Sequence, residues 1–267
     1  MGLRWAKFVW LVSGLLPLYG AGSVQQGGET VVRAASGAVS EYLVSLPHIA
    51  YGGAWRTKIV IRNSSASSAD IQLFYYGSSG TPVALPFNGL PSNHTDLIIP
   101  AYGAQEVEPD WQGAEAVAWA GLLYSNPGLE IQGVFLWHNP ADPPDKYTEA
   151  AAPVVSRVNM SCVVPLPSDA TSQTMPFDET EGRFSGYGFT NTTADPVTLT
   201  LKFYGQSGQL LGQTSQQFAG FSHDQFLLRD KVPAVLGNKG VMVIGGTGMV
   251  PLGFRFTPYF TFTTWLP

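Results

Sequence analysis

One stretch of this chain occurs twice at a constant spacing. The segment NSSASSADIQLFYYGSSG begins at Asn63, and the related segment NTTADPVTLTLKFYGQSG begins at Asn191, with no gap between the aligned positions. A repeat at fixed spacing indicates that one supersecondary unit occurs twice in the same chain. The chain is therefore restricted to architectures made of two similar halves.

Both copies alternate apolar and polar residues as strands do. The positions expected to face a core are Thr57, Ile59, Ile61, Ile71, Leu73 and Tyr75 in the first copy, and Ser185, Tyr187, Phe189, Leu199, Leu201 and Phe203 in the second. This alternation predicts antiparallel strands with one buried and one solvated face. The Asn-led segments at 63–66 and 191–194 and the Tyr-Gly-x-Ser-Gly segments are typical of tight turns. Each copy is therefore predicted to contain a three-stranded meander.

The composition favours an all-β chain. Aromatic residues make up 12% of the sequence, and 20 prolines and 30 glycines supply turns. Strand-like segments recur at short spacing, about seven or eight per copy, which suits two packed sheets in each half. We expect one β-sandwich over 41–155 and a second over 156–267, with one helical turn near 230–237. The GGTG at 245–248 is predicted to be a hairpin turn.

The N-terminal segment has the pattern of an export signal. Arg4 and Lys7 come before the apolar run FVWLVSGLLPLYG, which ends in the small residues of 20–22. This order is typical of a secretory signal peptide, and the run is shorter than the ~20 apolar residues that span a bilayer. We expect a signal peptide at 1–22, a flexible linker at 23–40, and a mature chain without a membrane span that is secreted or held in the cell envelope. An N-terminal membrane anchor is the alternative.

The run GGAWRTKIVIRNSSASSADIQLFYYGSSGTPVALP resembles repeat domains of exported bacterial proteins. The resemblance rests on the Gly-Gly-x-Trp-x-Thr start at Gly52, the Asn-led turn and the glycine-containing hairpin that follows. It spans roughly residues 41–267, although 181–184 replace the Gly-Gly-x-Trp start in the second copy. The resemblance implies two tandem immunoglobulin-like sandwiches with no assigned activity.

Charge and cysteine content narrow the classes of partner. The formal net charge is −5 and the chain has no basic run, which disfavours binding to nucleic acid or to anionic lipid. Cys162 is the single cysteine, so no disulfide can form within the chain. We expect it to be a buried structural thiol.

Catalytic and metal-binding motifs are missing from the sequence. The histidines His48, His94, His138 and His223 have no second ligand at metal spacing, and each is expected to be an isolated group, exposed or at a strand end. The serines near Gly77 and Gly205 do not fit a GxSxG nucleophile elbow. We therefore expect no enzymatic activity and no cofactor.

Two carboxylate clusters remain as weak metal candidates. Asp142, Asp145 and Glu149 lie close together in one Pro-rich segment and could supply oxygen ligands for calcium. Asp178, Glu179 and Glu181 lie together in FDETEGR. Neither spacing matches an EF-hand, so both segments are expected to be solvated acidic loops.

Aromatic residues supply the remaining candidate site. Trp111, Trp137 and His138 lie among turn residues or at a strand end, where exposed rings can stack on sugars or on apolar partners. The competing interpretation is that the tryptophans fill the gap between two sheets. We expect a noncatalytic interaction or structural protein with an extracellular protein or polysaccharide partner. Carbohydrate binding through exposed aromatic residues is the alternative, and a hydrolase without a visible motif is the third.

Overall fold

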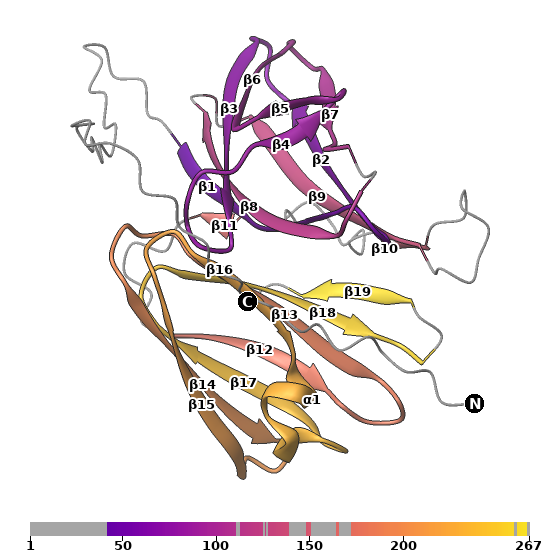
Figure 1. Ribbon diagram of the computed structural model, residues 1–267, viewed down its shortest axis with the longest axis vertical. Helices are drawn as coiled ribbons and strands as arrows, with labels where there is room; N and C mark the ends of the chain where they lie inside the picture. The colour runs from indigo at the N-terminus through magenta and orange to yellow at the C-terminus, as the bar shows by residue number, and fades with distance from the viewer. Residues whose placement is uncertain are drawn as a thin grey trace, which may run out of the picture. The chain divides into compact units, whose positions relative to one another are not determined.

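In a computed structural model the chain is an all-β protein of antiparallel sheets (Figure 1). The structure describes residues 42–110, 113–124, 126, 128–138, 148–150, 164–165, 172–258 and 261–265. The predicted signal peptide and linker lie outside these residues, as does Cys162. The predicted division of the chain at 155 also lies outside them. None of the helices in the described ranges is long and apolar enough to cross a membrane.

The elements follow one another along the chain in this order: β1 (Tyr42–Tyr51), β2 (Trp55–Asn63), β3 (Ala69–Gly77), β4 (Leu85–Phe87), β5 (Leu90–Ser92), β6 (His94–Ile99), β7 (Ala104–Val107), β8 (Ala116–Tyr124), β9 (Leu129–Trp137), β10 (Thr148–Ala150), β11 (Val164–Pro165), β12 (Ser172–Asp178), β13 (Phe184–Asn191), β14 (Val197–Gly205), β15 (Leu210–Phe218), β16 (His223–Leu227), α1 (Leu228–Lys231), a 3-10 turn η1 (Pro233–Val235), β17 (Lys239–Gly245), β18 (Met249–Phe256) and β19 (Phe262–Trp265).

The described strands form two pairs of large sheets with the same strand order. The first sheet pair consists of β11-β1-β8-β3-β6 and β10-β9-β2-β7, and the second of β12-β17-β14-β15 and β16-β13-β18-β19. The sequence repeat aligns β2 with β13 and β3 with β14. The order β1-β8-β3-β6 then corresponds to β12-β17-β14-β15, and the order β10-β9-β2-β7 corresponds to β19-β18-β13-β16. The repeat in the sequence is therefore a repeat of topology. A small sheet, β4-β5, is inserted after β3 in the first copy.

Each sheet pair surrounds an apolar core. All of the positions predicted to face the core are at most 2% exposed. The polar residues between them, Gln72, Thr198, Thr200 and Lys202, are exposed. The alternation in the sequence therefore identified the buried face of four strands correctly. Burying a large apolar side chain contributes roughly 1.5–3 kcal/mol, so these faces are a main source of stability.

The predicted meander is wrong in both copies. Strands β2 and β3 lie in different sheets, as do β13 and β14, so the Asn-led turn carries the chain from one sheet to the other. The GGTG segment does the same between β17 and β18 and is not a hairpin turn. Only β14 and β15 form the predicted hairpin. A half-buried strand has the same alternation whether the next strand pairs with it or crosses to the facing sheet, and so the sequence could not distinguish the two.

The Asn-led turns are built identically. In both copies the asparagine Oδ1 accepts from the backbone N–H (3.0 Å) and the hydroxyl (2.7 Å) of the residue two positions ahead. Nδ2 donates to the carbonyl four positions ahead, at 2.7 Å for Asn63 and 2.8 Å for Asn191. The two side chains are 3% and 0% exposed. Nδ2 also donates outside the turn, to the carbonyls of Ile99 and Pro100 in the first copy and of Ala219 in the second, so the buried amides are fully bonded.

Candidate functional site

The residues predicted to form a binding site are only partly described by the structure. Trp111, Asp142 and Asp145 lie outside the described residues. Trp137 is half-buried at the end of β9, with its ring centroid 6.5 Å from that of Trp55, and it packs against the first core. The backbone N–H of His138 donates to the carbonyl of Ala54 at 2.8 Å. Ligand binding by Trp137 and His138 stays a prediction.

The carboxylate candidates gain no support as a metal site. Glu149 lies in β10, which pairs with the end of β9. In the described ranges no three His, Cys, Asp or Glu side chains are grouped so that they could hold a metal ion. The calcium hypothesis for Asp142, Asp145 and Glu149 therefore rests on the sequence alone.

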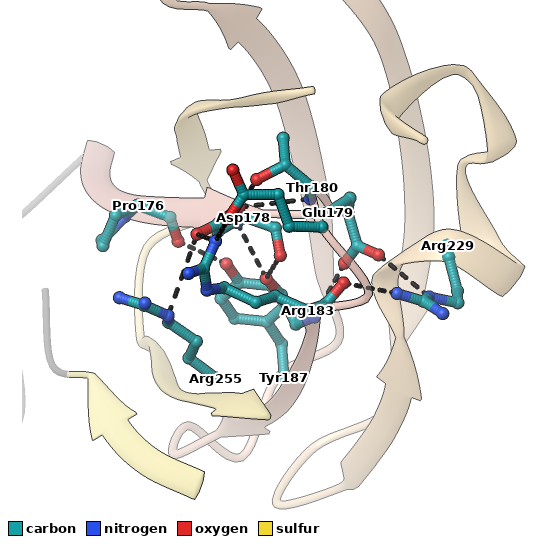
Figure 2. A network of polar contacts seen from close by, with 10 residues as sticks. Pro176, Asp178, Glu179, Thr180, Arg183, Tyr187, Arg229 and Arg255 are labelled. Atoms are coloured by element: carbon teal, nitrogen blue, oxygen red, sulfur yellow. Dashed lines mark hydrogen bonds and ion pairs between the residues drawn. The ribbon is translucent and has the colours of Figure 1, made fainter. Parts of the chain in front are cut away.

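The segment 178–183 forms a network of ion pairs (Figure 2). The side chain of Glu179 is 0% exposed, and its Oε2 accepts from Nε of Arg229 at 2.9 Å. Its Oε1 accepts from the backbone N–H of Ser185 at 2.7 Å. Arg229 also donates to the carbonyl of Arg183 at 2.6 Å and lies 4.8 Å from the centroid of the Phe184 ring. The prediction of a solvated loop is wrong for Glu179, because α1 brings Arg229 to it from 50 residues further along the chain.

The two neighbouring carboxyl groups have pKa values shifted in opposite directions. Burial raises the pKa of Glu179, although the Ser185 N–H and Arg229 oppose the shift. Burial would also raise the pKa of Asp178, but hydrogen bonds from Thr180 and the charges of Arg255 and Arg183 together outweigh it and lower that pKa. Opposite shifts are common in acid–base pairs at active sites. Here arginines bind both carboxylates. The N–H of Thr180 in the turn also donates to Asp178, and the N–H of Ser185 in β13 donates to Glu179, so the arrangement holds β12 to β13 and α1.

A second polar cluster lies between the two sheet pairs. His48 on β1 and His223 on β16 are 5% and 3% exposed, and Nδ1 of His48 lies 3.2 Å from Nε2 of His223. Nδ1 of His223 lies 3.1 Å from the hydroxyl of Thr190. That hydroxyl donates to the carbonyl of Pro47 at 2.8 Å. The expectation of isolated histidines is wrong for this pair, which is 175 residues apart in sequence and has no motif that would reveal it.

Burial governs the electrostatics of the histidine pair. It lowers the pKa of His48 well below its usual value, and the neighbouring His223 adds to that shift. It lowers the pKa of His223 to about 4, against opposing contributions from Asp224 and the carbonyl of Phe189. Both rings are therefore neutral at pH 7.

The outer face of the β12-β17-β14-β15 sheet is the candidate binding surface. We call it the hydroxyl–amide face; its exposed members are Ser172, Thr174, Thr198, Thr200, Lys202, Gln213, Ser215 and Gln217. Strand pairing places Thr200 opposite Ser215 and Lys202 opposite Gln213. A hollow of about 360 Å³ lies over these four residues, together with Leu201 and Thr214.

One end of the hydroxyl–amide face is less polar. Tyr204 is half-buried there, and Val241, opposite it on β17, is 44% exposed. In the first copy Tyr76 aligns with Tyr204, but its ring stacks on Trp119 at 4.6 Å and on Phe221 at 5.6 Å. The tyrosine of the first copy is therefore used in packing between the sheet pairs. The tyrosine of the second copy instead lies between Val241 on β17 and Leu210 on β15, both of which are exposed.

Comparison with known proteins gives no family. No protein-family profile and no curated protein matches the chain. Among solved structures, a putative beta-galactosidase from Bacteroides fragilis is 10% identical with a TM-score of 0.18, over 82% of this chain and 31% of that one. The Bacteroides uniformis beta-glucuronidase is 8% identical with a TM-score of 0.16, over 78% of this chain and 24% of that one. The chain thus spans less than a third of either enzyme, and scores this low identify neither a fold family nor an activity.

Proposed function

We propose that this protein is an exported, noncatalytic binding protein of two immunoglobulin-like repeats, secreted or held in the cell envelope. It contacts its partner through the hydroxyl–amide face. The observation that carries this proposal is the open array on that face, in which all of the named side chains except Lys202 are neutral hydroxyls or amides, with a hollow over it. Neutral polar groups have a smaller desolvation cost than charges, so such a face can bind an uncharged polar partner.

The rest of the described structure supports a role as a rigid support for that face. Leu252, Phe254 and Phe262 belong to the second sheet pair but pack in the core cluster of the first. A shared apolar core restricts movement between the two halves at neutral pH, in contrast to the polar interfaces of mobile domains. The carboxylates of Asp178 and Glu179 are bound by arginines, which favours a structural role for them.

Export is supported by the sequence. The order of charges, apolar run and small residues at 1–22 is that of a signal peptide. Charged residues make up only 12% of the chain, about half the usual share, and hydroxyls and amides replace them on the surface.

A neutral polysaccharide is the second candidate, as the specific partner of this face. Tyr204 offers a ring for stacking on a sugar, while Gln213, Ser215 and Thr200 offer donors and acceptors for its hydroxyl groups. Stacking through Trp137 is the alternative within the same class, because its ring lies at the end of β9.

A panel of immobilised polysaccharides, neutral and anionic, tests both proposals with the purified full-length protein. Tyr204→Ala and Gln213→Ala should each weaken binding by about tenfold, equivalent to ~1.4 kcal/mol. Gln72→Ala is the matched control, because Gln72 is exposed at the position of the first copy that aligns with Thr200. Trp137→Ala tests the alternative.

The outcomes separate the two proposals. If a neutral polysaccharide binds and only the Trp137 variant loses affinity, the hydroxyl–amide face is not the binding site. If no polysaccharide binds but an envelope protein is captured in a Tyr204-dependent way, the hydroxyl–amide face is the binding site and its partner is a protein. Release of reducing ends from any bound polysaccharide would contradict the noncatalytic role.

A further inference from the structure

The junction between the two sheet pairs contains a buried chain of hydrogen bonds. It leads from the Pro47 carbonyl through the Thr190 hydroxyl and His223 to His48, at 2.8, 3.1 and 3.2 Å. Pro47 and His48 belong to β1 of the first sheet pair, and Thr190 and His223 to β13 and β16 of the second. These hydrogen bonds therefore link the two halves of the molecule.

The bonds fix which nitrogen of each ring carries hydrogen. A carbonyl only accepts, so the Thr190 hydroxyl donates to Pro47 and accepts from Nδ1–H of His223. Nε2 of neutral His223 then has a free lone pair, which accepts from Nδ1–H of His48. Only the bond between the two rings requires His223 to be neutral, because Nδ1–H of His223 can donate to Thr190 in either protonation state.

Protonation of both rings removes the link between them. A proton on Nε2 of His223 turns this acceptor into a donor. The contact then survives only if the hydrogen of His48 moves from its Nδ1 to its own Nε2, which leaves Nδ1 of His48 free to accept. With both rings protonated, two N–H groups face each other and two positive charges lie with ring centroids 5.2 Å apart. The His48 ring also lies 5.9 Å from that of Phe135 and 5.6 Å from that of Phe254, and phenyl rings offer little solvation to the charge.

The groups around the pair compensate these charges only in part, because burial outweighs the effects of Asp224 and of the Phe189 carbonyl on His223. On β16, Asp224 is next to His223, but its carboxylate accepts from Gln216 Nε2 at 2.6 Å and from the Gln225 N–H at 2.8 Å. The residues in contact from β1, β9, β13 and β18 are Pro47, Phe135, Gly188, Thr190 and Phe254, which carry no charge.

We propose that the His48–His223 pair makes this junction an acid-sensitive joint. The joint is closed while both rings are neutral, and it opens when they take up protons. Opening exposes Leu252 and Phe254, which pack in the first core when the joint is closed. The inference concerns the junction alone and does not depend on what binds the hydroxyl–amide face.

The direction of the pH response follows from linkage. Solvated histidines in an open joint have a pKa of ~6.5, whereas burial lowers the pKa of His223 to about 4 in the closed joint. The open form therefore binds more protons over this interval. The closed form has its full advantage above ~6.5 and loses it as the pH falls towards 4, by up to about tenfold per pH unit for each histidine.

Amide hydrogen exchange on the full-length protein tests the proposal. The His223 N–H donates to the Ser78 carbonyl at 3.1 Å, and the Trp119 indole N–H donates to the Phe221 carbonyl at 2.8 Å, so both report closure of the junction. After correction for intrinsic exchange rates, their protection should fall about 15-fold from pH 6.5 to 5, as expected for one histidine whose pKa is ~6.5 in the open joint and about 4 in the closed joint. The Tyr75 N–H, bonded to the Asn93 carbonyl within the first sheet pair, should keep its protection.

Two variants separate the histidine pair from general acid effects. The double variant His48→Gln, His223→Gln keeps side chains that donate and accept but do not titrate, and its junction protection should be independent of pH in this range. His94→Gln, which replaces an exposed histidine, is the control, and its junction protection should depend on pH as in the wild type. The proposal is overturned if the double variant loses protection at the same pH as the wild type, or if wild-type protection persists to pH 4.5. If the double variant does not fold, titration of the two wild-type imidazoles by NMR decides: a pKa near 6.5 in the closed state contradicts the proposal.

Discussion

Strands β2 and β13 hold the same place in the two sheet pairs, yet their outer faces are opposites. Their inward residues are equally buried, as with Ile61 and Phe189 at 0% exposure. On the outer face, β2 carries Lys58 and Arg62, whereas β13 has Gly186 and Thr190 at the aligned positions. The outer face of β2 meets solvent, and Lys58 there pairs with Glu106 on β7, whereas the outer face of β13 is buried.

The outer face of β13 packs against β1, and its residues there are small. Gly188 lies beside the histidine pair, where an added Cβ would come within 3.2 Å of Cε1 of His223 and 3.5 Å of Nδ1 of His48. Small residues on β13 therefore let β1 approach closely. The inner face of the repeat builds a core, and the outer face decides whether another sheet pair can pack against it.

Exchanging outer-face residues between the copies should have the largest effect. Thr190→Arg places in the junction the residue that β2 has at the aligned position; it buries an unpaired charge and removes the bonds to Pro47 and His223. We expect a loss of about 3–5 kcal/mol in the free energy of unfolding, or failure to fold. Urea denaturation measures it.

The reciprocal exchange is the matched control. Arg62→Thr changes an exposed side chain and should alter the free energy of unfolding by less than about 0.5 kcal/mol. Equal effects of the two exchanges would contradict the difference in burial between the two outer faces.

The Asn-led turns have the same hydrogen bonds in both copies, so replacing the asparagine should reduce the stability of the protein by a similar amount in either copy. Asn63→Ala and Asn191→Ala each leave buried carbonyls and N–H groups without partners. Each should reduce the free energy of unfolding by about 2 kcal/mol. The two losses, measured by thermal or urea unfolding, should agree within about 1 kcal/mol. A large difference would indicate that one turn is supported mainly by its surroundings.

The acidic segment of the second copy, which the first copy lacks, should give the smallest effect. The pKa of Asp178 is lowered in the folded protein, so its contribution is present above its unfolded pKa and is lost as the pH falls through its folded pKa. The pKa of Glu179 is raised, so protonation of Glu179 favours the folded state as the pH falls. Asp178→Asn should cost about 1 kcal/mol at pH 7, because its arginine partners are partly exposed.

The same two residues give a test of sign. Between pH 5 and 3, Asp178→Asn should lose less stability than the wild type, and Glu179→Gln should lose more. Unfolding curves at several pH values measure the slopes. Slopes that change in the same direction for both variants would contradict the opposite pKa shifts.

The sequence predicted the local features of the fold well. Alternation found the buried positions of β2, β3, β13 and β14 because solvent and core impose that period on any half-buried strand. The helical turn expected near 230–237 corresponds to α1 and η1. The meander was wrong because alternation within a strand carries no information about which strand lies beside it.

The candidate site was predicted less well, for a physical reason. Glu179 looked like part of a solvated loop because its partner, Arg229, is distant in sequence. The same holds for His48 and His223, whose contact depends on how the two sheet pairs pack. The side chains of the hydroxyl–amide face come from three strands, so the face has no motif in any one of them.

By itself, the sequence determined that the chain is all-β, that one unit occurs twice, and which side chains of the repeated strands face inward. Those properties follow from local alternation and turn chemistry, which act over a few residues. Only the tertiary structure decided that the repeated turn crosses between sheets, that two histidines meet in the junction, and which outer face stays open. Those outcomes depend on contacts between residues far apart in the chain, where packing and desolvation select the partners.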